Sequence, residues 1–281
     1  MPTHLHLRPS TRLTVDGSPL RPDVLCALAL DEVARVRLTH GNRAAELGEL
    51  FLVDRDGTDL DLIISGEMPH VHSIGAGTSA GRLRVEGDVG DEAGARMTGG
   101  SIEITGNAGS WAGAALRGGE LRIRGNAGDG LGSAYDGDRV GMRGGFIRVD
   151  GDSGREIGLA MRRGLIVVSG DTGDLVGRGL VAGSIFVFGA VGRYTGVAMK
   201  RGTLALYGDV DADVSLPPTY VASGRAQPPF LRFYLKELAA RGIVRAAEEI
   251  AAGRDLERYN GDLAEGGKGE IWLAGRGLGK P

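Results

Sequence analysis

The stretch Gly164-Leu165-Ile166-Val167-Val168-Ser169-Gly170-Asp171-Thr172-Gly173 is the plainest copy of a pattern that recurs along much of the 281-residue chain. Each copy opens with a glycine and has a second glycine six residues later, with alternating apolar residues between them. The opening glycines are spaced by 19 residues, apart from one step of 26, and are Gly81, Gly100, Gly119, Gly145, Gly164, Gly183 and Gly202. A fixed period near twenty residues is typical of a solenoid, in which each repeat is one structural unit.

The alternation inside each repeat predicts one short strand with one buried face. The expected inward pairs are Leu83/Val85, Ile102/Ile104, Leu121/Ile123, Ile147/Val149, Ile166/Val168, Ile185/Val187 and Leu204/Leu206. A third inward row follows, made of Met97, Leu116, Met142, Met161, Leu180 and Met199. A repeat of this length is too short for a strand, a helix and a return strand, and the glycines suit tight corners at positive φ. We therefore predict an all-β fold, a single-stranded, right-handed parallel β-helix of about seven to eight coils.

The parts outside the repeats define the expected domain organisation. Residues 1–56 are predicted to be an N-terminal β cap, because the open end of a solenoid exposes unpaired strand edges. Residues 57–214 would form the β-helix, and residues 215–281 a linker, two helices and a tail. The helices are expected from Phe230 to Arg241 and from about Ile243 to Ala252, with Gly253 ending the second.

Composition excludes several classes of protein. The formal net charge is −3, no apolar run approaches membrane-spanning length, and no basic tail is present, so we expect neither a membrane nor a nucleic-acid partner. The N-terminus lacks the pattern of a secretory signal, and Cys26 as the single cysteine excludes an internal disulfide. These features predict a cytoplasmic protein.

The residues show no recognisable catalytic constellation. All five histidines lie within the first 72 residues, and none has a serine or cysteine nucleophile at a known spacing. His70 and His72 would share one strand face, which suits either a metal or a corner with surface histidines; without a third ligand in that repeat we predict no metal site. The glycines follow the period and match no nucleotide-binding motif. We expect no catalytic residue and no cofactor bound by this chain alone.

Outward positions turn apolar in the last three repeats. This apolar strip consists of Val167, Phe186, Phe188, Ala205 and Tyr207. A contiguous apolar surface of this kind has to be covered. Two covers are open: the predicted helix that begins at Phe230, or a partner subunit that would contact Val167, Phe186, Phe188 and Tyr207.

The 26-residue step places seven extra residues around Ser133 to Arg139. Insertions in a solenoid lie on one face and often make contacts, although a solvated loop is the alternative. Tyr135 and Arg139 are therefore candidate partner contacts.

A file of cations precedes the opening glycines. This cationic file is made of Arg117, Arg143, Arg162 and Lys200, with Arg163 and Arg201 beside it. Stacked at the spacing of neighbouring strands, these charges would lie roughly 5 to 10 Å apart and would suit a polyanionic chain. The alternative is a row of charged, solvated corners.

Three segments carry a resemblance to a known family. They are the coil ending Gly141-Met142-Arg143-Gly144-Gly145, the Gly41-Asn42 and Leu47-Gly48 elements of the cap, and the tail from Tyr259 to Ile271. Together they resemble the C subunit of formylmethanofuran dehydrogenase over nearly the whole chain. The repeats alone also resemble the C-terminal β-helix of the glutamate synthase large subunit.

The resemblance implies one of two settings. In methanogens, the C subunit belongs to a molybdenum or tungsten enzyme that reduces CO2 onto methanofuran. In methylotrophic bacteria, its counterpart belongs to a formyltransferase/hydrolase complex, which moves a formyl group from tetrahydromethanopterin to a methanofuran analogue and hydrolyses it to formate. Only four of the 33 basic residues are lysines, a bias typical of GC-rich bacterial genomes, so we favour the bacterial complex.

In either setting the family implies that the chemistry resides in sister subunits, an amidohydrolase-like one and a formyltransferase. The chain would then be a non-catalytic scaffold, in agreement with its residues. A methanofuran-type carrier is expected in the complex, and its polyglutamate tail is the polyanion that the cationic file would guide.

Overall fold

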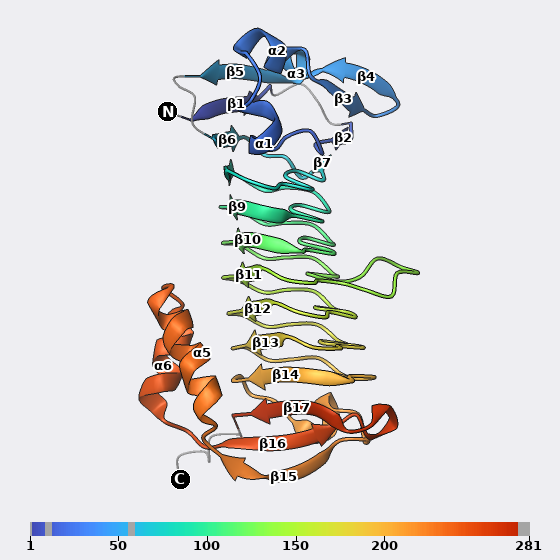
Figure 1. Cartoon of the computed structure of the whole chain (residues 1–281), viewed down its shortest axis with the longest axis vertical. Helices are drawn as coiled ribbons and strands as arrows, with labels where there is room; N and C mark the ends of the chain where they lie inside the picture. Colours follow the sequence, from blue (N-terminus) through green and yellow to red (C-terminus); the bar gives the residue numbers. More distant parts are fainter. Residues whose placement is uncertain (1, 9–12, 56–59, 275–281) are drawn as a thin grey trace.

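The strands stack into a rod in the computed structural model, which describes residues 2–8, 13–55 and 60–274 (Figure 1). One 13-stranded sheet has the order β15-β16-β17-β14-β13-β12-β11-β10-β9-β8-β6-β1-β5, and a four-stranded sheet has the order β4-β3-β2-β7. The strand-dominated, β-helix-like fold expected from the repeat is therefore confirmed. The winding hand and the number of coils stay predictions, and the boundary expected at residue 56 lies outside the described residues.

Each repeat supplies one strand that pairs in parallel with the next. These strands are β6 (Asp61–Ser65), β8 (Arg82–Glu86), β9 (Thr98–Ile104), β10 (Gly118–Ile123), β11 (Phe146–Val149), β12 (Leu165–Val168), β13 (Ser184–Val187) and β14 (Arg201–Leu206). Ile166 lies opposite Ile147 on one side and Ile185 on the other, so like positions stack. Every predicted inward side chain, including the third row, is at most 1% exposed. The inward assignment is confirmed.

The two glycine rows serve different physical needs. The opening glycines all have positive φ, as at Gly164 (φ +115°), which confirms the expected corner. In the second row, represented by Gly170, only Gly87 has a positive φ. The expectation of positive φ is therefore wrong for the other glycines of this row. A Cβ at Gly170 would lie 2.7 Å from the Gly151 carbonyl oxygen and 2.1 Å from an Asp152 carboxylate oxygen. Close contact with the preceding coil explains this row.

The N-terminal residues cover the first rung of the stack. They form β1 (Thr3–Leu7), β2 (Val15–Asp16), α1 (Pro22–Leu25), α2 (Leu30–Ala34), β3 (Arg37–His40), β4 (Arg43–Glu46), α3 (Leu47–Leu50), β5 (Phe51–Arg55) and, after β6, β7 (Val71–His72). Strand β1 pairs in parallel with β6 and antiparallel with β5. Leu5 and Phe51 are fully buried beneath this cover. The edge of β6 is thereby satisfied by the chain itself.

The C-terminal residues close the other end. They form α4 (Ala212–Ser215), β15 (Val221–Ala226), α5 (Pro229–Ala240), α6 (Val244–Ala252), β16 (Leu256–Gly261), the 3-10 turn η1 (Leu263–Glu265) and β17 (Lys268–Leu273). Both expected helices are confirmed to within a residue, and Gly253 ends α6 in the left-handed region. No helix in the described ranges is long and apolar enough to cross a membrane.

Strand β17 is a rung of the rod that the repeat period did not reveal. It pairs in parallel with β14, with Gly269 opposite Gly202 and Ile271 opposite Leu204. The segment Gly269-Glu270-Ile271-Trp272-Leu273 carries the glycine and the alternation of the other repeats, but the α5 and α6 region separates it from them. Strand β16 then pairs with β17, and β15 with β16, both antiparallel.

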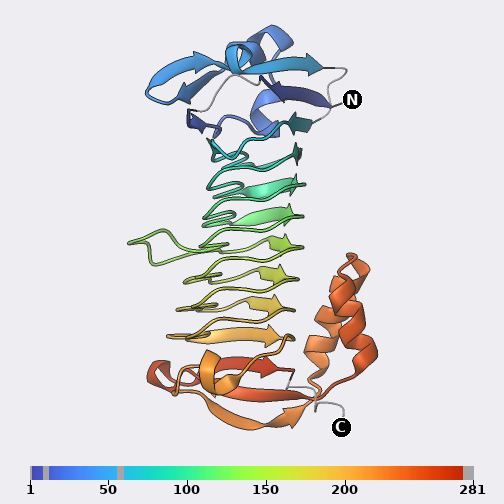
Figure 2. The same ribbon diagram turned by 180° about the vertical axis from the view of Figure 1, so that it is seen from behind.

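The helix hairpin of α5 and α6 covers the apolar strip. Both views place it along the rod, on the side opposite the insertion loop, which is the seven-residue insertion around Ser133 to Arg139 (Figures 1 and 2). The residues of this second core are Phe146, Val167, Phe186, Phe188, Ala205, Tyr207, Leu231, Leu235, Leu238, Ile243, Ala246, Leu256, Trp272 and Ala274. The strip residues in it are at most 5% exposed. The chain's own helices thus occupy the place left open for a partner at Val167, Phe186, Phe188 and Tyr207.

A buried arginine fastens the far end of this hairpin to the rod. Arg148 on β11 is 7% exposed, and its guanidinium donates to the carbonyl oxygens of Arg241 (2.7 Å) and Gly242 (3.1 Å), just beyond α5. It also donates to Asp150 at 2.5 Å. A cation at the C-terminal end of a helix is favoured by the helix dipole as well as by these bonds.

Replacement of Ile166 by aspartate should strongly destabilise the rod. A carboxylate would lie in a fully buried row without a partner, so we expect a loss of more than about 4 kcal/mol in unfolding free energy, measured by chemical denaturation. The matched control, Ile166→Val, should lose only about 1 kcal/mol. Equal unfolding midpoints for the two variants would contradict the core assignment.

Replacement of Arg148 by methionine should loosen the hairpin while leaving the rod folded. The variant loses two charge-assisted hydrogen bonds from a buried guanidinium to backbone carbonyls, which together contribute about 1.5 to 3 kcal/mol to the attachment of the hairpin. Amide hydrogen exchange should rise selectively over residues 229–252. Arg155→Met removes an exposed ion pair with Asp129 and should leave this exchange unchanged. Unaltered exchange in Arg148→Met would refute the fastening role.

Candidate functional site

Each member of the cationic file directly follows a buried residue of the third inward row, and this sets its position on the rod. The backbone N–H of Arg117 donates to the Met97 carbonyl at 2.8 Å, and that of Arg143 to the Leu116 carbonyl at 2.6 Å. Arg162 repeats this bond to Met142. Equivalent backbone bonds in consecutive coils hold these three positions directly above one another. The structure therefore brings together residues that are up to 45 positions apart in the sequence.

The file is interrupted before its last member. The next coil places Val181 at the same position, where its N–H donates to the Met161 carbonyl, and Lys200 follows one coil later. The Lys200 ammonium lies 3.7 Å from a carboxylate oxygen of Glu265. Lys200 is thus separated from the arginines by one rung and shares its charge with an acidic neighbour.

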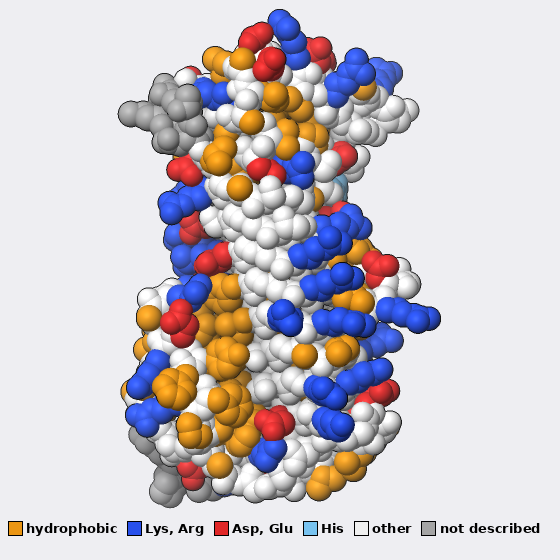
Figure 3. Space-filling view, in the orientation of Figure 1, with side chains coloured by type: hydrophobic (Ala, Val, Ile, Leu, Met, Phe, Trp, Pro, Cys, Tyr) orange, Lys and Arg blue, Asp and Glu red, His pale blue; other side chains and the backbone are white. Residues whose placement is uncertain are grey.

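The remaining file members present unpaired positive charge to the surface. Arg117, Arg143 and Arg162 are exposed and form no ion pair with any acidic side chain of the described ranges. The flanking Arg163 and Arg201 are exposed as well. Figure 3 shows Lys and Arg side chains gathered in a column along one side of the rod, level with the insertion loop. Stacked at about 4.8 Å per rung, such charges repel one another and favour an anion beside them.

The insertion loop is rooted next to this file. Its base is closed by a backbone bond from Met142 to Gly132 (3.1 Å), and Ala134 and Gly141 donate to carbonyls of the next coil. A Cβ at Gly141 would lie 2.3 Å from the Leu159 carbonyl oxygen, so the loop leaves and rejoins the rod through a position that only glycine fits. The loop is consequently held at a fixed place beside Arg143.

A hollow of about 180 Å³ lies where the loop meets the file, and we call it the arginine pocket. Its lining is Arg96, Ala115, Arg117, Asp138, Arg139, Val140 and Arg143. The lining contains four arginines and one aspartate, so the pocket carries net positive charge. Guanidinium forks bind carboxylates and phosphates in bidentate fashion, so this lining suits an anion.

Tyr135 contacts one of the arginines that line this pocket. The Arg96 guanidinium carbon lies 4.6 Å from the centre of the Tyr135 ring, in a cation–π contact. Burial raises the pKa of the Tyr135 hydroxyl, with a further contribution from Glu92 and an opposing one from Arg96. The phenol therefore stays neutral at physiological pH. Its hydroxyl is enclosed and has no hydrogen-bond partner within the described residues.

Arg96 is a site residue that was not predicted from the sequence. It has positive φ in a row of corner positions whose equivalents in later coils include Ala115, Ala160, Gly179 and Ala198. An arginine in a column of small residues was the available signal, but the corner had no assigned partner until the loop was placed. Arg139 and the two file arginines were predicted separately, and the structure brings them together here.

The two histidines considered as metal ligands have different surroundings. His72 accepts a hydrogen bond at Nδ1 from the Asp91 backbone N–H at 3.0 Å. His70 has an enclosed Nε2 without a partner among the residues described. Within those residues, no three His, Cys, Asp or Glu side chains gather as a metal site would require.

Comparison with known proteins gives no match to any family model. The C subunit of the tungsten-containing formylmethanofuran dehydrogenase 2 of Methanothermobacter thermautotrophicus is 39% identical over 85 residues, which are 29% of this chain and 32% of that protein. The C subunit of the formyltransferase/hydrolase complex Fhc of Methylorubrum extorquens is 36% identical over 86 residues, 31% of this chain and 32% of that protein. These matches span about a third of the relatives' length.

A solved structure is similar over the whole chain. It is a chain of the formyltransferase/hydrolase complex FhcABCD from Methylorubrum extorquens, determined in complex with methylofuran. The similarity has a TM-score of 0.88 and 34% sequence identity, and it covers 97% of this chain and 100% of that chain. The similarity therefore includes both ends of the rod as well as the repeats.

Acidification should destabilise the N-terminal end through His70. Burial lowers the pKa of His70, and His40 and His72 lower it further, so the unfolded chain binds this proton more readily than the folded one. Stability should be complete above about pH 6.5 and fall as the pH drops below that value. Melting temperatures between pH 7.5 and 5.0 should show a shallower fall for His70→Gln. The exposed His6→Gln should keep the wild-type slope; a wild-type slope in His70→Gln would refute the assignment.

Proposed function

The chain belongs to the C-subunit family of formyltransferase/hydrolase complexes and formylmethanofuran dehydrogenases, and on this premise we propose that it is the scaffold subunit of a formyltransferase/hydrolase complex. The observation that carries the proposal is the likeness along 97% of the chain to a chain of the FhcABCD complex. In the proposed complex, a formyl group passes from tetrahydromethanopterin to a methanofuran analogue and is hydrolysed to formate. Amidohydrolase-like and formyltransferase sister subunits would carry out this chemistry.

The fold supports a scaffold role on physical grounds. The rungs are joined by backbone hydrogen bonds along the rod, and the interior is a continuous apolar core. A body of this kind holds surface groups at fixed separations, because close-packed interiors deform little. Docked subunits would therefore keep a constant distance from one another. A cytoplasmic location, expected from the sequence, stays a prediction.

Two alternatives raised by the sequence have different support. The molybdenum or tungsten enzyme of methanogens is represented by relatives matched over about a third of their length, whereas the likeness to the FhcABCD chain extends along the whole chain. The glutamate synthase alternative depended on the repeats alone, and the cap and tail also match here. Elemental analysis of the complex purified from its native source distinguishes the first alternative, since a formyltransferase/hydrolase complex is expected to contain no stoichiometric molybdenum or tungsten.

The scaffold proposal is tested by comparing the isolated chain with the complex. We expect the chain, purified alone, to show formyl transfer and formate release at background level. Affinity capture of the tagged chain from its native source should retain a formyltransferase and an amidohydrolase-like protein, identified by mass spectrometry. Activity of the isolated chain above background would overturn the scaffold proposal.

A second proposal concerns the arginine pocket and the cationic file beside it. The four guanidinium groups of the pocket and the exposed Arg162 form one positive surface, with Asp138 as its single acidic lining residue. We propose that this surface binds the polyanionic tail of a methanofuran-type carrier. The neighbour's complex holds methylofuran, which supports the presence of such a carrier. Tyr135 and Arg139 would contribute through the loop wall rather than through a separate contact.

Neutralising the file should weaken polyanion binding. The variant Arg117→Gln/Arg143→Gln/Arg162→Gln should lose affinity for a poly-γ-glutamate oligomer by on the order of tenfold or more at low salt, because each exposed ion pair contributes up to about 1 kcal/mol. Isothermal titration at two salt concentrations measures this, and the wild-type affinity should fall as salt rises. The control Arg43→Gln/Arg225→Gln/Arg245→Gln removes the same charge elsewhere. Equal affinities in the two triple variants would refute the proposal.

A further inference from the structure

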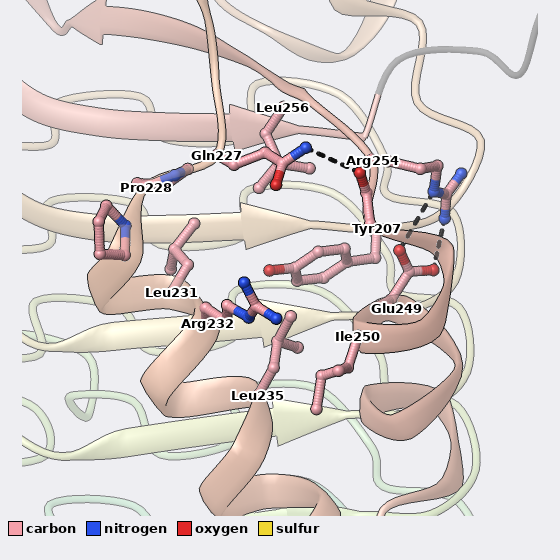
Figure 4. A pocket seen from close by; sticks show the side chains of 12 residues that line it. Tyr207, Gln227, Pro228, Leu231, Arg232, Leu235, Glu249, Ile250, Arg254 and Leu256 are labelled. Carbon is pink, nitrogen blue, oxygen red and sulfur yellow. Dashed lines mark hydrogen bonds and ion pairs between the residues drawn. The ribbon is translucent and has the colours of Figure 1, made fainter.

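A second cavity lies between the helix hairpin and the rod, away from the cationic file. This hairpin pocket has a volume of about 280 Å³ and is lined by residues that precede α5, by α5 and α6, and by the ends of β14 and β16 (Figure 4). Its apolar walls include Pro228, Leu231, Leu235, Ile250 and Leu256. A cavity near the lower end of the usual range, with apolar walls and few polar groups, is typical of a site for a small ligand.

One polar group in this lining has no partner. Tyr207 is 5% exposed, and its hydroxyl is enclosed without a hydrogen bond to any described residue. Figure 4 shows the hydroxyl directed to the α5 side of the pocket, where Leu231 and Arg232 lie. Burial raises the pKa of Tyr207, so the hydroxyl keeps its proton and is a donor without an acceptor. A buried hydroxyl left in this condition costs free energy that a bound acceptor would recover.

The charges around the cavity indicate that a ligand accepting a hydrogen bond from Tyr207 would be negatively charged. Glu249 and Arg254 pair with each other, and Gln227 donates to the Gly253 carbonyl and to Asp255. Arg232 is exposed on α5 and forms no ion pair with the acidic residues that the structure describes. The lining therefore carries one uncompensated positive charge, on the same side as the Tyr207 hydroxyl. Because Arg232 is long and exposed, its guanidinium can shift to admit a ligand.

We propose that the hairpin pocket binds a small monocarboxylic acid with an apolar body. The carboxylate would lie between the Tyr207 hydroxyl and the Arg232 guanidinium, and the hydrocarbon part would pack against Leu235, Ile250 and Leu256. This site is separate from the arginine pocket and does not depend on the scaffold proposal. It would make the cover of the apolar strip responsive to a metabolite, since the ligand contacts both the hairpin and the rod.

The test uses the full-length chain and sodium octanoate as the probe, with binding measured by isothermal titration and by the shift in melting temperature. Octanoate should bind and stabilise the wild type. Tyr207→Phe and Arg232→Gln should each weaken octanoate binding by about tenfold, because each removes a hydrogen bond to a charged group. The neutral analogue octanamide should bind the wild type about tenfold more weakly than octanoate for the same reason.

Two controls keep the outcome decisive. Tyr207→Phe without ligand should melt at or above the wild-type temperature, since it removes only an unsatisfied hydroxyl; this separates loss of binding from loss of folding. Arg245→Gln removes an arginine of α6 outside the lining and should bind octanoate as the wild type does. The proposal is overturned if the wild type binds neither probe, or if Tyr207→Phe and Arg232→Gln bind octanoate with unchanged affinity.

Discussion

Neighbouring coils touch through their backbones, and most other features of the rod follow from this contact. Parallel strands bring like positions into register, and corner residues repeat their hydrogen bonds from rung to rung. This close approach leaves no room for a side chain at positions such as Gly170, where a Cβ would overlap the preceding coil. Glycine is therefore needed here for space, and at positions such as Gly164 for backbone conformation. Together the two rows allow the apolar ladders to stack in register from rung to rung.

Stacking also turns a position in the repeat into a line on the surface. The cationic file is one such line, and the apolar strip is another. The insertion loop and the helix hairpin each attach to one of them, on opposite sides of the rod (Figures 1 and 2). The loop adds Arg139 to a row of exposed arginines and creates a polar hollow. The hairpin covers aromatic side chains and leaves an apolar hollow with a single unpaired hydroxyl at Tyr207.

The two hollows differ because their covers differ. The loop between β10 and β11 is short and polar, and the arginines beside it stay exposed. The hairpin is amphipathic and is held by Arg148 at one end and by the bonds of Gln227 at the other. Its apolar side removes Phe186 and Val167 from water entirely. A polar partner suits the first surface and a small amphipathic ligand the second.

The interior of the rod could be predicted from the order of the amino acids, since alternation at a fixed period identifies which face of each strand points inward. The same holds for the composition of the cationic file, the two helices and the family resemblance. The cover of the apolar strip was settled only by the folded chain, because the pattern of Val167 and Phe186 requires burial but does not say by which partner. Folding also placed Arg96 beside the loop and β17 beside β14, where long insertions hide the register. Which residues lie close together across such separations is decided by tertiary packing, because the repeat period gives no information about segments outside it.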